Sequence, residues 1–165
     1  MSCFRVALLL LLLACASSAQ TNEPPIFSAP LRALTPSRKG VVFPAKLARE
    51  FGQQCSRASP FGHWSSVSPS KSEIRDVEAA LPRFIAANRK VWRSPLPDFR
   101  FQYGALERGG KRLIYVNALP LDTTDNRKVW RRGAEVVCDG GAQFWGVEWD
   151  VRAKAFQNAG FNGPG

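Results

Sequence analysis

The residues best suited to acid–base chemistry are three carboxylates near the end of the chain, Asp139, Glu148 and Asp150. A catalytic carboxylate needs a cleft that shifts its pKa and a second group that shares the proton transfer. Asp139 precedes two glycines and is typical of a turn, Glu148 alternates with tryptophans and is expected to face solvent, and Asp150 begins the next turn. The pattern therefore predicts no catalytic pair and favours a protein that is not an enzyme.

The remaining reactive groups give little support for metal, nucleophilic or phosphate chemistry. His63 is the only histidine, and a protein metal site needs several ligands of the His, Cys or carboxylate type. The glycine pairs at 109–110 and 140–141 do not lead from a strand into a helix, as a phosphate-binding loop does, and they are typical of turns. We therefore expect no cofactor and no bound metal.

The first residues indicate export. A short basic start, residues 1–5, precedes an unbroken apolar run over residues 6–14 and then a group of small residues. This is the pattern of a secretory signal peptide, and the apolar run is too short to span a bilayer stably. The sequence predicts a signal peptide over 1–19, a proline-rich extended leader over 20–43 and a single domain over 44–165.

Two processing routes fit this start. Ser17 and Ala19 occupy the small-residue positions before a cleavage site, which gives a mature periplasmic or secreted chain. Alternatively, Leu-Leu-Ala-Cys at residues 12–15 resembles a bacterial lipobox, and Cys15 then carries a lipid that anchors an outer-membrane lipoprotein. Only nine residues separate Arg5 from Cys15, so we favour cleavage after Ala19.

Cys55 and Cys138 are predicted to form a disulfide. Of the four cysteines, Cys3 and Cys15 belong to the signal segment, so an even pair reaches the oxidising compartment. Closing this loop of about 83 residues is worth about 3–5 kcal/mol on the chain-entropy model. A nucleophilic pair of Cys55 with His63 is the alternative, and nothing else in the sequence supports it.

The mature chain is strongly basic. Without Arg5 it holds 22 basic and 13 acidic residues, a net charge of about +9. Such a charge favours anionic partners, including lipid headgroups, acidic glycans and acidic proteins. Because the chain is exported, nucleic acid is not expected, and we expect contact with a membrane only through a lipid at Cys15.

The segment Arg-Lys-Val-Trp-Arg occurs twice, at residues 89–93 and 127–131. Basic residues around a tryptophan suit an anionic membrane surface or a stacked ligand. The candidate basic binding patch consists of Arg127, Lys128, Trp130, Arg131 and Arg132. We favour the simpler interpretation, in which each tryptophan turns inward and the basic side chains are solvated.

Hydrophobic spacing predicts one long helix over about 69–92. Apolar residues from 74 to 91 recur at intervals of three and four, so that one stripe faces a core. Ser70 and Glu73 fit a capping box at its start. Pro82 removes a backbone donor and is expected to kink the helix.

Alternation and turn residues predict an antiparallel sheet over about 98–162. The expected strands are residues 99–103, 113–118, 129–138, 143–150 and, at the edge, 156–161. Trp145, Val147 and Trp149 alternate along one strand and are expected to face the long helix. A short helix is expected earlier, over 44–54. The predicted fold class is α+β, one long kinked helix packed on a four- to five-stranded antiparallel sheet in the order α-β-β-β-β.

This order resembles the cystatin-like superfamily, in which a helix is followed by a curled antiparallel sheet, and the likeness covers roughly residues 68–162. The segments QQCSR, SPSKSEIRDVEAALPRF and CDGGAQFWGVEWD are also similar to those of small, uncharacterised exported bacterial proteins. The resemblance implies a cystatin-like roll, supports the disulfide and supplies no activity. The inhibitory motif of cystatins, Gln-x-Val-x-Gly, is absent, because residues 143–147 read Gln-Phe-Trp-Gly-Val.

These observations predict an exported, non-enzymatic protein of the bacterial envelope. We expect it to act as a binding or inhibitor-like module for an anionic surface or a protein partner. Two alternatives stay open at this point. One is a hydrolase of envelope polymers that uses Asp139, Glu148 or His63, and the other is a structural lipoprotein anchored through Cys15.

Overall fold

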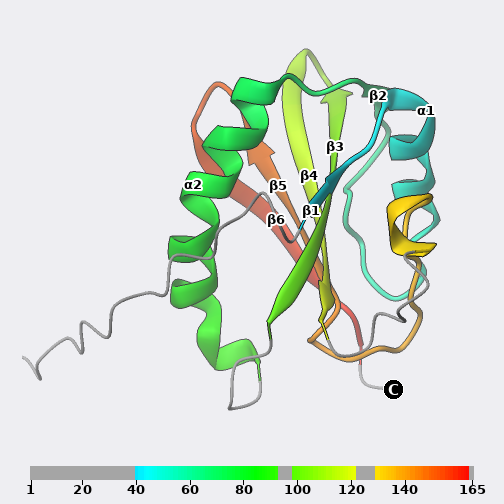
Figure 1. The fold of residues 1–165 in the computed structure, drawn as a ribbon, viewed down its shortest axis with the longest axis vertical. Helices are drawn as coiled ribbons and strands as arrows, with labels where there is room; N and C mark the ends of the chain where they lie inside the picture. Colours follow the sequence, from blue (N-terminus) through cyan, green and yellow to red (C-terminus); the bar gives the residue numbers. More distant parts are fainter. Residues whose placement is uncertain (1–39, 93–97, 122–128, 164–165) are drawn as a thin grey trace, which may run out of the picture. The chain divides into compact units, whose positions relative to one another are not determined.

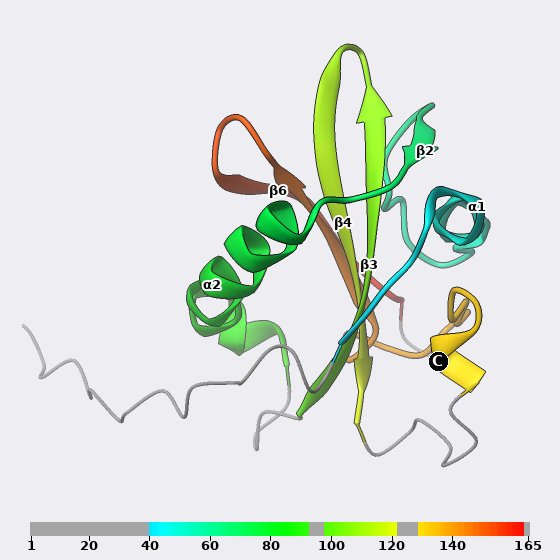
Figure 2. The ribbon, with the colours of Figure 1, turned by 45° about the horizontal axis from the view of Figure 1, so that its top comes forward.

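The computed structural model describes residues 40–92, 98–121 and 129–163. Within these ranges a mixed sheet of six strands has the order β1-β3-β4-β5-β6, with β2 also paired to β3. The strands are β1 (Gly40–Val42), β2 (Ser65–Val67), β3 (Phe99–Arg108), β4 (Lys111–Pro120), β5 (Trp145–Asp150) and β6 (Ala155–Phe161). The helix α2 (Lys71–Asn88) covers one face of the sheet, the first face (Figure 1). Helix α1 (Ala45–Ala48) and the 3-10 helix η2 (Arg49–Gln53) lie on the opposite, second face (Figure 2).

The predicted fold class is wrong, because the sheet is not purely antiparallel and is not covered by a single helix. β1 runs parallel to β3, with Gly40 opposite Phe101, and β2 pairs antiparallel with the far half of β3. β1 lies in the predicted leader, and β2 lies between the two predicted helices, where no strand was predicted. Val41 packs against the second-face core and Val67 against the first-face core, so burial of these side chains outweighs the weak local signal. The order α-β-β-β-β of a cystatin-like roll therefore does not describe this chain.

The strand predicted over 129–138 is also wrong. Val129–Arg131 is a short 3-10 helix, η4, and the chain from 132 to 144, described throughout, contains no strand. Side chains of the sheet form hydrogen bonds with the backbone of this segment instead. The Gln102 amide group donates to the carbonyl of Gly133 over 2.9 Å and accepts from the amide of Glu135 over 2.9 Å. Asn117 donates to the carbonyl of Glu135 over 3.0 Å, so these bonds replace a strand ladder.

The first face carries the larger apolar core. α2 contributes a buried stripe of Ile74, Val77, Leu81 and Ile85, and the helix continues through Pro82. Trp145, Val147 and Trp149 are buried in the same cluster, which confirms that this side of β5 faces the helix. The rings of Phe84 and Trp145 lie 5.4 Å apart. Each fully buried apolar side chain stabilises the fold by about 1.5–3 kcal/mol, so this core supplies a large part of the folding free energy.

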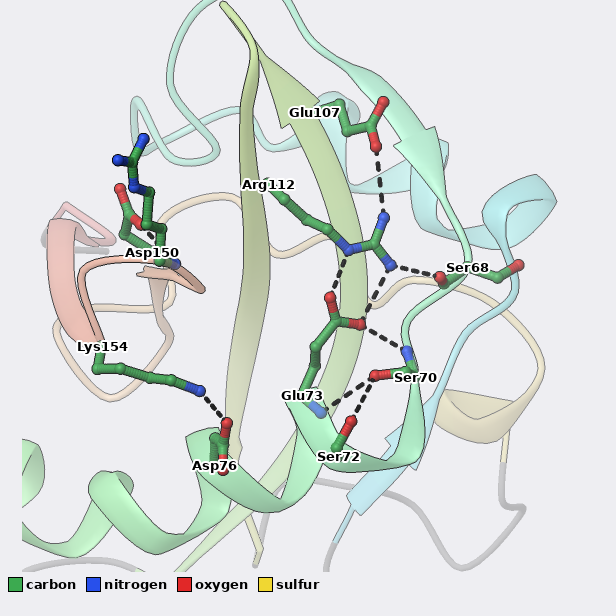
Figure 3. Close-up of polar contacts among 10 residues, drawn as sticks. Ser68, Ser70, Ser72, Glu73, Asp76, Glu107, Arg112, Asp150 and Lys154 are labelled. Atoms are coloured by element: carbon green, nitrogen blue, oxygen red, sulfur yellow. Dashed lines mark hydrogen bonds and ion pairs between the residues drawn. The ribbon is translucent and has the colours of Figure 1, made fainter.

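The start of α2 is tied to the hairpin of β3 and β4. Ser70 Oγ accepts from the Glu73 amide over 3.2 Å and Glu73 Oε2 accepts from the Ser70 amide over 2.6 Å, so the predicted capping box is confirmed. The same carboxylate pairs with Arg112 of β4 (Figure 3). On the neighbouring turn of α2, Asp76 pairs with Lys154 from the turn between β5 and β6 (Figure 3). These two pairs fix the helix over the sheet.

Several predicted features lie outside the described residues. They are the signal peptide, Cys15, the leader up to residue 39, and Arg127 and Lys128 of the basic patch. They therefore stay predictions. Neither α2 nor any other helix in the described ranges is long and apolar enough to cross a membrane.

The Glu73 carboxylate gives the fold a specific dependence on pH. The hydrogen bond from Arg112 lowers the pKa of Glu73 from 4.5 to about 2, because the bonds from Arg112 and Ser70 outweigh the opposing effect of burial. A carboxyl group whose pKa is lowered by folding stabilises the folded state above its unfolded pKa and loses that contribution as the pH falls. We expect Glu73→Gln to lower the free energy of unfolding at pH 7 by about 2 kcal/mol.

Urea unfolding at a series of pH values measures this effect. The difference between the wild type and Glu73→Gln should be full near pH 5 and should vanish as the pH approaches 2. Glu107→Gln is the matched control, since this carboxylate contacts the same Arg112 but is half exposed, and it should change the free energy by less than about 0.5 kcal/mol. Equal effects of the two substitutions would contradict the assignment.

Candidate functional site: the Phe61 loop

A loop of irregular chain, residues 54–64, joins η2 to β2 and lies on the side of the sheet away from α2 (Figure 1, Figure 2). We name it the Phe61 loop. Its serines, proline and glycine disfavour helix and strand. Long loops without secondary structure in a compact domain are commonly functional segments, so the contacts that hold this loop decide what it can do.

The disulfide of Cys55 with Cys138 attaches the start of the loop and confirms the predicted bond. The two Cα atoms are 5.4 Å apart although 83 positions separate them in the sequence. The Asp139 amide also donates to Ser56 Oγ over 3.2 Å. The bond therefore joins the loop to the segment 132–144, so the two irregular segments on the second face restrain each other.

Arg57 points from the loop into a group of polar side chains on the sheet. Its Nη1 donates to Asn162 Oδ1 over 2.8 Å, its Nε to Tyr115 Oη over 3.3 Å, and its Nη2 to Asn117 Oδ1. Tyr115 Oη in turn donates to the carbonyl of Ser59 over 2.9 Å. Burial raises the pKa of the Tyr115 hydroxyl, so the group stays protonated and keeps its proton for this bond.

Two glycines of the sheet make room for the loop. A Cβ atom at Gly146 on β5 would collide with the hydroxyl of Tyr115. A Cβ atom at Gly160 on β6 would lie 2.8 Å from the Cβ of Ser59, closer than such atoms approach. Gly160 therefore leaves room for the loop itself, whereas Gly146 leaves room for the Tyr115 hydroxyl, which donates to the loop.

A buried ion pair holds the apex of the loop by its main chain. Arg108 and Glu148 form a bidentate pair, with Nη1 to Oε1 at 2.7 Å and Nη2 to Oε2 at 2.6 Å. The Phe61 amide donates to Glu148 Oε1 over 2.9 Å, and Arg108 Nη1 donates to the Phe61 carbonyl. Asn158 Nδ2 donates to the remaining carboxylate oxygen, Oε2, over 2.7 Å. Both main-chain polar groups of Phe61 are thus fixed by one pair.

The side chain of Phe61, in contrast, is 58% exposed. It is the only aromatic among the large hydrophobic side chains that the described part of the chain exposes. The guanidinium of Arg108 lies 6.0 Å from its ring centroid. Gly62 follows with φ of 69°, the left-handed conformation that glycine adopts without strain, and His63 is exposed. A fixed backbone that presents a free aromatic ring is preorganised for binding.

A hollow of about 400 Å³ lies beside this apex, between β2 and the tip of the β3–β4 hairpin. Its lining consists of Ser65, Glu107, Arg108, Gly109, Gly110, Lys111 and Arg112. Arg108 belongs both to the hollow and to the ion pair under Phe61. The exposed ring is therefore bordered on this side by basic and polar groups.

The residues considered for catalysis do not form a site. Glu148 was expected to face solvent, which is wrong, because the second face is also covered and the side chain is buried. Burial raises the pKa of Glu148, but hydrogen bonds from its three partners lower it further, so its pKa lies below the ordinary value and the group is ionised. Asp139 lies in an exposed turn with φ of 60°. His63 is exposed, and no group of three metal-ligating side chains occurs within the described ranges.

The structure places part of the candidate basic patch. Trp130 is buried, whereas Arg131 and Arg132 are exposed. The Trp130 ring contacts two guanidinium groups, that of Arg131 at 4.6 Å and that of Arg100 at 5.2 Å. The Trp130 ring therefore lies inside the protein, with exposed basic side chains beside it.

Comparison of the chain with protein-family models, with curated proteins and with solved structures finds no match. Function is therefore inferred from the geometry. Sequence reasoning did not identify the Phe61 loop as a candidate site, although one signal was present. Asn117 stands in the apolar run Leu-Ile-Tyr-Val-Asn-Ala, and a buried amide in a strand indicates that a polar partner covers it.

The ion pair under the loop should control the exposure of the Phe61 amide. Glu148→Gln removes the charge that Arg108 faces and weakens the acceptor of the Phe61 amide. We expect a loss of about 2–3 kcal/mol in the free energy of unfolding and faster hydrogen exchange at the Phe61 amide. Asp139→Asn removes one negative charge from an exposed turn and should change neither quantity. Unchanged exchange at Phe61 in Glu148→Gln would show that the ion pair does not hold the loop.

Proposed function

We propose that the protein is an exported, non-enzymatic binding module of the bacterial envelope that recognises a protein partner through the Phe61 loop. The signal-like start of the sequence supports export. The single observation that carries the binding role is the Phe61 side chain, which is exposed while its amide and carbonyl are both held by the Arg108–Glu148 pair. This arrangement fixes the position of an aromatic ring without burying it.

A buried ion pair is a costly way to stabilise a core. Removing two charges from water carries a desolvation penalty, and apolar side chains of similar size often stabilise a core equally well. An ion pair has one capacity that apolar side chains lack, because its carboxylate accepts from a backbone amide while its guanidinium donates to a carbonyl. Arg108 and Glu148 use this capacity on a single residue, Phe61. The pair therefore supports a role in positioning the loop.

The chemistry around the ring defines the partner. An aromatic side chain at the centre of an interface gains most when it fills an apolar pocket from which water is excluded. The hollow beside Phe61 is lined by three basic side chains, Arg108, Lys111 and Arg112, and by one acidic side chain, Glu107. Complementary charge then calls for acidic side chains around that pocket. We therefore infer an exported or envelope protein that has an apolar pocket with an acidic rim.

The test compares capture of partners from envelope extracts by the wild-type exported chain and by variants. Phe61→Ala removes the ring and leaves its backbone contacts in place, so the fold should persist. We expect the captured partner to bind this variant at least about 30-fold more weakly, the loss typical of an aromatic hot spot. Titration of the identified partner against each variant measures the affinity.

Val42→Ala is the matched control, since this side chain is also exposed, at 46%, and lies on β1. It should bind the partner as the wild type does. Equal affinity of Phe61→Ala and wild type for the partner would refute the proposal. It would also be refuted if the two chains captured the same set of proteins. Circular dichroism of each variant checks that the fold is retained.

A further inference from the structure

Each copy of Arg-Lys-Val-Trp-Arg includes a short 3-10 helix, but at a different place in the motif. In the first copy η3 (Arg89–Val91) covers the first three residues, and in the second η4 (Val129–Arg131) covers the last three. In each copy the tryptophan is buried, with Trp92 5% and Trp130 4% exposed, while the preceding valine is exposed, at 43% in the first copy and 58% in the second. Each copy therefore inserts a ring into the protein and leaves a valine beside basic side chains at the surface.

Both copies contact the first residues of β3. The Trp92 ring lies 5.6 Å from the ring of Phe99, and the Trp130 ring lies 5.2 Å from the guanidinium of Arg100. Because consecutive strand residues point to opposite faces, the copies flank this end of the sheet from its two faces. Figure 1 shows the end of α2 and the start of β3 at the same end of the sheet.

This arrangement gathers positive charge where β3 begins. We name the group the basic end; its members are Arg89, Lys90, Arg100, Arg131 and Arg132. None of the five forms an ion pair with an acidic side chain of the described chain. At the hairpin end of the sheet Arg108, Arg112 and Lys154 are ion-paired with Glu148, Glu73 and Asp76. At the start of β3 the described residues hold these five basic side chains and the acidic Asp98, so basic side chains predominate there.

The N-terminal part of the chain joins the domain at this same end. β1 is parallel to β3 and Gly40 lies opposite Phe101, so β1 starts near the start of β3. Residues 1–39, which include the signal-like segment and Cys15, precede Gly40 in the sequence.

We propose that the basic end binds the surface of an anionic phospholipid bilayer. Its basic side chains contact lipid phosphates, and Val91 and Val129 contact the boundary between headgroups and acyl chains. A bilayer fits better than an acidic polysaccharide, since exposed valines gain free energy at a lipid boundary and none from a hydrated glycan. The Phe61 loop lies near the hairpin tip and plays no part in this contact, so the inference is independent of the proposed function.

Co-sedimentation with lipid vesicles tests the proposal. The exported chain carries Cys15→Ser, so that no attached lipid contributes to binding, and the vesicles consist of phosphatidylcholine with or without phosphatidylglycerol. Binding should require phosphatidylglycerol and should weaken as salt is added. Each basic residue near an anionic surface contributes about 1 kcal/mol, so Arg131→Glu/Arg132→Glu should weaken binding by at least about 30-fold.

Two further variants keep the result interpretable. Arg89→Glu/Lys90→Glu changes two exposed residues of the other copy and should also weaken binding. These residues do not contact Trp130, so their effect cannot come from loss of the contact between Arg131 and the Trp130 ring. Lys111→Glu/Arg152→Glu makes the same change in net charge at the hairpin end and should bind as the wild type does.

Loss of binding in all three variants would overturn the basic end in favour of general attraction by net charge. Absence of wild-type binding to anionic vesicles would overturn the proposal outright, and Phe61→Ala should bind vesicles normally.

Discussion

A polar side chain that is removed from water must find a hydrogen-bond partner, and an unpaired one costs about 1–3 kcal/mol. The second face of this sheet buries Gln102, Asn117 and Glu148. Side chains of neighbouring strands supply some of the partners, since Asn117 donates to Gln102 and both Arg108 and Asn158 donate to Glu148. The other partners are backbone groups of two irregular segments, the Phe61 loop and residues 132–144, and the disulfide joins these two segments to each other. The rest of the molecule depends on these hydrogen bonds. Through them the sheet fixes the conformation of the two segments, and the segments exclude water from its second face.

The two faces of the sheet consequently have different roles. The first face is an apolar core with α2, and its side chains need only shape and volume to fit. The second face specifies a conformation, because each of its hydrogen bonds fixes the position of a backbone group in an irregular segment. This is how a small domain can present an exposed ring at Phe61 in one position. The basic end depends instead on basic side chains that gather where β3 begins.

The features set by local pattern could be predicted from the sequence. Local residue spacing predicts the capping box at Ser70 and the burial of Trp145 and Trp149. The number of cysteines predicts the disulfide. The mixed sheet could not be predicted in this way, since three-residue strands such as β1 carry almost no periodic signal and form only when β3 offers an edge. The burial of Glu148 was missed for a related reason. Alternation indicated correctly that it lies opposite the tryptophans, but alternation says nothing about what covers the opposite face.

The polar residues inside β3 and β4 were the signal that this covering layer exists. The identity of the layer depends on contacts between residues up to 105 positions apart, as between Arg57 and Asn162.

The central claim is that buried polar groups make the Phe61 loop as rigid as the sheet beneath it. Backbone NMR order parameters test this most directly. The account predicts values of about 0.85 for residues 55–64, equal to those of β3 and β4. Values below about 0.6 across this range would contradict it.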